Sequence, residues 1–214
     1  MTEVKEVLIN DFVSWEKARE ILGPKAVGID VATKLGLEFS EEELARWQTV
    51  PFTEKELLSA QSLGLYLFAI PEIDLDTLNN LPDVNFNILY PEDWNFDRKS
   101  RGGYRLIWAP SSWIKRDRPY DNQYLVNQFE VEGIYACPTI DNLYLFCAWL
   151  KEHNELFADC FLESKDTDPS GWKMSVGVYK DWPNQLCVSS ENTFGSYIDG
   201  DLGEKIFQEY RSLV

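Results

Sequence analysis

The stretch Asp166–Gly171 has the spacing of a metal-binding loop. Oxygen-bearing side chains stand at alternate positions, on Asp166, Asp168 and Ser170, and a glycine takes the sixth position. This is the first half of a calcium loop, in which alternate side chains point towards one ion and the glycine permits a sharp turn. The twelfth position, where a calcium loop has glutamate, is Gly177. Two interpretations stay open: a calcium site on these three side chains, or an ordinary turn before a strand.

A second chemical feature is a concentration of positive charge, which we call the basic segment, between Arg98 and Arg118. Seven of the twenty basic residues of the chain fall within these 21 residues, against the single acid Asp117, for a net charge of +6. The remainder of the chain carries thirteen bases and thirty-five acids, a net charge of −22, so that the whole chain has −16. The seven bases are Arg98, Lys99, Arg101, Arg105, Lys115, Arg116 and Arg118.

The basic segment has two interpretations. Guanidinium groups interleaved with aromatic rings suit phosphate, nucleotide or single-stranded nucleic acid and could also bind an acidic protein, whereas the same charges could pair with acids of their own chain. For the first case the candidate binding residues are Arg105, Trp108, Trp113, Lys115, Arg116 and Arg118. An acidic protein partner or a second copy of the chain is then expected, because a strongly acidic molecule repels nucleic acid and anionic membranes on average.

Histidine is the commonest general base, and His153 is the only histidine of the chain. It follows an apolar stretch that predicts a helix, and the C-terminus of a helix favours a positively charged imidazole. The cysteines show no CxxC pairing, which favours buried, reduced thiols in a cytoplasm. Cys147 and Cys160 stand six and seven residues from His153, spacings that do not place thiol and imidazole one helical turn apart. We expect a structural histidine and no catalytic residue.

Clusters of acids near the start of the chain predict helix N-termini. Ser40–Glu43 and Thr53–Glu56 each have a hydroxyl followed three residues later by glutamate, the form of a capping box. Both clusters are therefore interpreted as helix starts instead of catalytic carboxylates. An earlier helix over 15–22, capped by Asp11 or Ser14, is expected to stop at the Gly-Pro pair that follows it.

The last third of the chain gives clearer periodicity. The stretch 143–150 is apolar on every side and continues to 157, which predicts a central buried helix. Alternation over 172–179 and a return over 185–190 predict an antiparallel hairpin. Its core face should carry Trp172, Met174, Val176 and Val178. Other predicted elements are strands at 65–70, 84–90, 104–108 and near 160–164, with helices around 74–81 and 202–213.

These elements predict the α+β class, with an antiparallel sheet, several short helices and one buried central helix. We expect a single unit over 1–214, within which 1–90 could form a helical subdomain and 104–214 an α+β subdomain. Between them, 91–119 is rich in Pro, Gly, Asp, Asn and Ser around a brief strand, which is typical of a long loop or a connection.

Several short phrases resemble, in the same order, those of an uncharacterised family of bacterial hypothetical proteins. The phrases are Lys17-Ala18, Ile21–Gly23 with Gly28, Val50–Glu54, Tyr104–Ile107 with Pro110, Val176–Tyr179 and Leu186–Val188. The resemblance spans roughly residues 15–203 and implies one conserved-order bacterial unit. The family has no assigned activity, so no function is implied. Where the family has an Asp-x-Asp-x-Asp-Gly phrase, Ser170 replaces the third acid.

The sequence thus predicts a non-catalytic binding or assembly protein of the bacterial cytoplasm. The chain start lacks a basic stretch followed by an apolar core, and the longest apolar runs, of eight residues, are too short to span a bilayer. The alternative is a divalent-metal-dependent enzyme that uses the carboxylates of Asp166, Asp168, Asp199 and Asp201. Convergence of these four acids in one cleft would favour the enzyme.

Overall fold

The computed structural model describes the chain in several ranges. The described residues are 11–62, 64–81, 87–89, 96, 98–108, 135–157, 162–171, 173–178, 185–190, 206–207 and 209–211. They form helices and three sheets, which confirms the predicted α+β class. Among these residues, no helix is both long enough and apolar enough to cross a membrane.

Within the part of the chain that the structure describes, five short α-helices lie between Trp15 and Asn79. Three of them begin at the predicted capping residues. The hydroxyl of Ser14 accepts from the amide of Lys17, and the first helix ends at Gly23, whose φ of 59° suits glycine. Both predicted capping boxes are present, at Ser40 with Glu43 and at Thr53 with Glu56. The elements are α1 (Trp15–Leu22), a 3-10 turn (Gly23–Lys25), α2 (Ile29–Lys34), α3 (Glu41–Arg46), α4 (Glu54–Ser62) and α5 (Leu75–Asn79).

The first five-stranded sheet, which we call the β4–β6 sheet, has the order β2-β4-β6-β12-β7. Its strands are β2 (Ala26–Val27), β4 (Tyr66–Ile70), β6 (Gly103–Trp108), β12 (Glu209–Arg211) and β7 (Tyr135–Ala136). β2 runs parallel to β4, and the other neighbours are antiparallel. Segments from the beginning, the middle and the end of the chain therefore share one sheet. A separate two-stranded sheet pairs β1 (Phe12–Ser14) with β3 (Thr49–Thr53).

The second five-stranded sheet, the β8–β10 sheet, contains the predicted hairpin. Its order is β11-β8-β9-β10-β5, with β11 (Ile206–Phe207), β8 (Leu162–Thr167), β9 (Lys173–Val178), β10 (Gln185–Ser190) and β5 (Asn87–Leu89). β9 and β10 pair antiparallel, and Met174 and Val176 are buried while Val178 is half-buried. Trp172 lies outside the described residues. Because β5 and β11 run parallel to their neighbours, the sheet is mixed and not purely antiparallel as expected.

The predicted closing helix over 202–213 is wrong, because two short strands, β11 and β12, lie in this range. β12 is hydrogen-bonded between β6 and β7, so its backbone groups are satisfied on both sides by strands distant in the sequence. An isolated helix of about twelve residues is marginal in water, and tertiary pairing overrides such a weak local preference.

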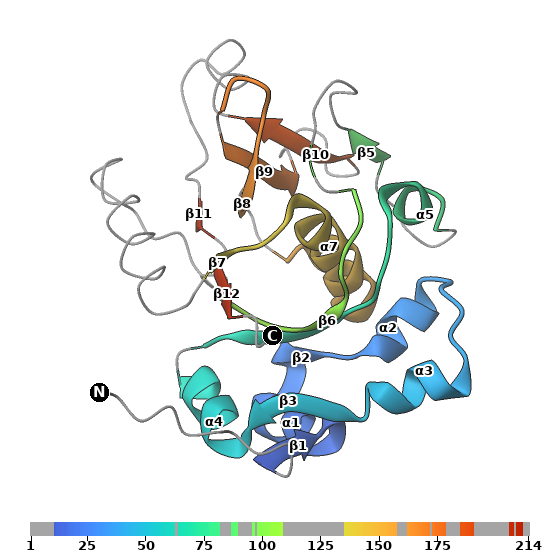
Figure 1. The fold of residues 1–214 in the computed structure, drawn as a ribbon, viewed down its shortest axis with the longest axis vertical. Helices are drawn as coiled ribbons and strands as arrows, with labels where there is room; N and C mark the ends of the chain where they lie inside the picture. The colour runs from blue at the N-terminus through green and yellow to red at the C-terminus, as the bar shows by residue number, and fades with distance from the viewer. Residues whose placement is uncertain are drawn as a thin grey trace.

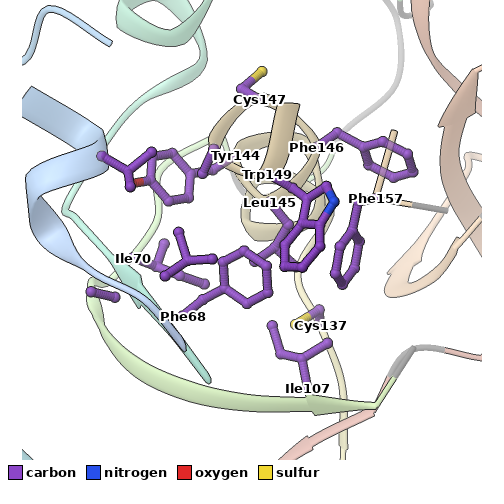
Figure 2. Close-up of a cluster of buried hydrophobic side chains, with 14 of the residues drawn as sticks. Phe68, Ile70, Ile107, Cys137, Tyr144, Leu145, Phe146, Cys147, Trp149 and Phe157 are labelled. Carbon is purple, nitrogen blue, oxygen red and sulfur yellow. The ribbon is translucent and has the colours of Figure 1, made fainter. Parts of the chain in front are cut away.

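The central helix α7 (Thr139–His153) lies between the two five-stranded sheets (Figure 1). It packs against β8, β9 and β10 on one side and against β2 and β4 on the other. This position explains why the helix is buried on all sides from Thr139 to Trp149. Aromatic rings from β4, α7 and the turn that follows it meet in this core, with Phe68, Trp149 and Phe157 in mutual contact (Figure 2).

Candidate functional site

The first turn of α7 lies within a group of polar side chains that we call the polar junction. Its members are Ser100, Arg105, Thr139, Asp141, Asn142, Ser164 and Asp166. Five of the seven are buried, and the Asp141 side chain is only 1% exposed. Buried polar groups cost free energy unless they find partners. A cluster of them inside an apolar core therefore indicates either a functional site or a polar network that specifies the packing of the core.

An irregularity in β8 brings this strand to the polar junction. Glu163 pairs with Ser175 and Thr167 pairs with Lys173, so four steps along β8 face only two steps along β9. The extra residues leave the regular ladder, and the amide of Lys165 donates instead to the carbonyl of Cys137, at 2.9 Å. Bulged strands re-aim their side chains in this way. Here the irregular stretch 164–166 is turned towards the start of α7.

Asp166 caps α7 from this irregular strand. The amide of Thr139, the first residue of the helix, donates to Asp166 Oδ2 at 2.6 Å. The preceding residue, Pro138, makes no side-chain capping bond. A carboxylate at a helix N-terminus satisfies an otherwise unpaired amide and interacts favourably with the helix dipole. One turn further, Asn142 Nδ2 donates to Ser164 Oγ at 3.3 Å, so two side chains of β8 hold the helix.

Arg105 approaches the same turn from the β4–β6 sheet. Its Nε lies 3.8 Å from Asp141 Oδ2, and the two side chains are 11% and 1% exposed. The guanidinium also donates to the carbonyls of Gly102 and Tyr104. Burial raises the pKa of the Asp141 carboxyl, while the Ser100 hydroxyl and the charge of Arg105 act in the opposite direction. A desolvated carboxyl beside a buried guanidinium is thus the electrostatic centre of the junction.

The other described bases of the basic segment lie on the surface. Arg98, Lys99 and Arg101 are exposed, and Lys99 Nζ is 3.7 Å from the carboxylate of Glu72. Lys99 and Arg105 therefore meet acids of their own chain, the arrangement that internal pairing predicts. Trp108 belongs to β6, but its side chain is not among those described. Trp113, Lys115, Arg116 and Arg118 lie outside the described residues.

The calcium-like stretch forms a tight turn after β8. Asp168 Oδ1 accepts from the amide of Ser170 at 2.9 Å, and the Asp168 carbonyl accepts from the amide of Gly171 at 2.9 Å. Asp166 is turned towards α7, as described above. In the described ranges, His, Cys, Asp and Glu side chains form no group of three that could hold a metal ion. Asp199 and Asp201 lie outside these ranges, so the calcium site and the four-carboxylate cleft stay predictions.

The single histidine lies against an aromatic ring at the C-terminal end of α7. The centroids of His153 and Trp149 are 3.8 Å apart, with their planes at 35°. The thiols of Cys137, Cys147 and Cys187 are free and buried. Burial raises the pKa of Cys147 to about 12 and that of Cys187 to about 11, so both are protonated thiols and poor nucleophiles near neutral pH.

The sequence did not single out Asp141 or Asn142. Both stand immediately before the stretch 143–150, and a helix buried on all sides must bury the polar residues of its own first turn. That position could have suggested that they need partners from the surrounding strands. The partners Arg105, Ser164 and Asp166 come from two strands that the sequence predicted in part, at 104–108 and near 160–164, but whose location beside the start of the helix it did not predict.

Comparisons of the chain with protein families, curated proteins and solved structures find no match. This outcome is consistent with the resemblance to an uncharacterised family.

Proposed function

We propose that the protein is a non-catalytic binding or assembly protein of the bacterial cytoplasm. The observation that carries the proposal is the structural use of those groups offered for catalysis by the sequence that lie among the described residues. His153 packs on Trp149, the Asp166 carboxylate caps α7, and Asp168 closes a turn. Three cysteines are buried thiols. Groups engaged in this way hold the fold together, which supports a function carried by the surface.

The basic segment is the surface that we assign to a partner. Arg105 is turned inward and Lys99 meets Glu72. Of the candidate binding residues, we therefore assign the contacts with a partner mainly to Lys115, Arg116 and Arg118. The complementary surface is an acidic protein, and a second copy of the chain, with its net charge of −16, is one such surface. Electrostatic complementarity of this kind contributes mostly to association rate and specificity.

If Arg116 and Arg118 serve a partner as proposed, reversing both to Glu is expected to remove a salt-sensitive interaction without unfolding the protein, because surface ion pairs contribute only about 0–1 kcal/mol to stability. Two probes can be used: the protein itself in sedimentation velocity, and labelled poly-L-glutamate in fluorescence anisotropy. With wild-type protein, association with at least one probe should weaken as salt rises from about 0.05 M to about 0.5 M, since salt screens exposed charges.

A matched control reverses two exposed bases outside the segment, Arg46→Glu in α3 and Lys55→Glu in α4. This control makes the same change in net charge but should retain association. Equal loss in both double variants would show a general charge effect and contradict the assignment. Unfolding of the Arg116→Glu/Arg118→Glu variant, or no association of wild-type protein with either probe, would also count against it.

A further inference from the structure

We propose that the polar junction couples the two five-stranded sheets, so that a change at Arg105 on β6 is transmitted through the first turn of α7 to β8. The coupling belongs to the fold itself and does not depend on the proposed function. It is a conformational device in which one turn of helix is held by hydrogen bonds on the β8 side and faces the Arg105–Asp141 ion pair on the β6 side.

The contacts come from opposite sheets but end on neighbouring residues. From the β4–β6 sheet, the Arg105 guanidinium faces the Asp141 carboxylate. From the β8–β10 sheet, the Asp166 carboxylate accepts from the amide of Thr139, and Ser164 accepts from Asn142. Thr139, Asp141 and Asn142 all belong to the first turn of α7. The residue that leads into this turn also takes part, since the Cys137 carbonyl accepts from the amide of Lys165.

The rest of α7 is held differently. From Leu143 to Trp149 the helix is buried among apolar and aromatic side chains, of which Figure 2 shows Phe68 and Ile70 of β4 and Ile107 of β6. Apolar contacts depend mainly on area and not on direction, so they set the position of the helix less sharply than directional contacts do. Hydrogen bonds depend steeply on distance and angle, and an ion pair weakens as its charges separate. The polar junction therefore fixes where α7 sits relative to each sheet.

Coupling follows from this geometry because a turn of α-helix moves as a rigid unit. If the pair on the β6 side is removed, the turn is no longer positioned from that side, and its bonds to β8 lose their alignment. Residues that share one polar network are non-additive in their effects on stability. A displacement of Arg105 is therefore expected to alter the contacts between α7 and β8.

Hydrogen exchange of the Lys165 amide tests the proposal, because this amide leaves the β8–β9 ladder to bond with the segment that leads into α7. The variant is Arg105→Met/Asp141→Asn, which removes the charge pair without leaving one buried charge alone. We expect the protection factor of the Lys165 amide to fall about tenfold further in this variant than in a control variant of similar global stability. Coupling of this size is typical of contacting residues in one network. Leu57→Ala is a suitable control, because this buried residue belongs to α4, which packs on α1 and β3.

The reciprocal variant keeps the test decisive if the double variant does not fold. Asp166→Ala removes the cap on the β8 side, and coupling requires it to lower the protection of the Leu106 amide in β6, because linkage between two sites is reciprocal. The proposal would be overturned if the variant that folds lost hydrogen-exchange protection only in the sheet that carries the substitution. It would also be overturned if the loss in the opposite sheet were no larger than in Leu57→Ala.

Discussion

Replacing Met174 with aspartate is expected to lower the free energy of unfolding by about 4–5 kcal/mol. Met174 is fully buried in β9, and its sulfur lies 3.8 Å from Thr139 Oγ1 at the start of α7. The substitution removes a large apolar side chain and places a carboxyl where the apolar contacts of the core offer it little compensation. Urea unfolding followed by circular dichroism measures the loss.

The matched control is Thr167→Asp, which introduces the same group at an exposed position of the neighbouring strand β8. Its effect should stay within about 0.5 kcal/mol, as for most surface substitutions. A Met174→Asp protein as stable as this control would show that Met174 does not face α7, and the predicted face of the hairpin would then be incorrect.

Replacing Arg105 with methionine is expected to cost about 3–5 kcal/mol, because it leaves the Asp141 carboxylate buried without its counter-charge. Methionine preserves much of the apolar stem of arginine, so the loss reports mainly on the charge. The guanidinium contacts with the Gly102 and Tyr104 carbonyls are lost as well. Denaturant unfolding near neutral pH measures the change.

Adding Asp141→Asn to Arg105→Met should recover a large part of this loss, because a buried pair can be replaced together at little cost. A double-mutant cycle then gives the interaction between the two positions. A cost below about 1 kcal/mol for Arg105→Met, typical of an exposed ion pair, would contradict the burial of the pair.

Features specified by neighbouring residues could be predicted from the sequence. The capping boxes at Ser40 and Thr53 need only residues three positions apart, and the stop at Gly23 needs only its own backbone freedom. The β9–β10 hairpin was also predictable, since alternation and a turn occur together in the sequence. Each of these features depends on residues close together in the sequence, so it can be predicted without knowing which distant segments pack against it.

Features set by distant partners could not be predicted. The range 202–213 has helical spacing, but β12 is fixed by strands β6 and β7 from elsewhere in the chain. The parallel pairing of β5 with β10 also joins segments far apart in the sequence. The polar junction joins residues of β6, α7 and β8 that are distant in the sequence, and it depends on the irregular register of β8, which no periodicity reveals.

The part played by each candidate site residue depends on the same distinction. Spacing offered Asp166 either as a metal ligand or as part of an ordinary turn, and it did not predict the contact that the structure shows with the amide of Thr139 at the N-terminus of α7, 27 residues away. Arg105 was a candidate either for ligand binding or for pairing with an acid of its own chain, and its position in β6 places it beside the buried Asp141, as internal pairing predicts. Spacing identified residues worth attention, and topology determined what they contact.

The burial of Asp141 at the polar junction is the claim on which this account most depends, and carbon-detected NMR titration of its carboxyl tests it directly. Assignment comes from the signal that Asp141→Asn removes. An unperturbed aspartate has a pKa of about 3.9. Because burial raises its pKa, Asp141 should titrate above that value. A raised folded-state pKa means that its contribution to stability is full below the unfolded-state pKa and is lost as pH rises through the folded-state value. The difference in free energy of unfolding between wild-type protein and Asp141→Asn should therefore change between the unfolded-state pKa and the folded-state pKa. A pKa at or below that of an exposed aspartate, with no change of this difference across the window, would contradict the account.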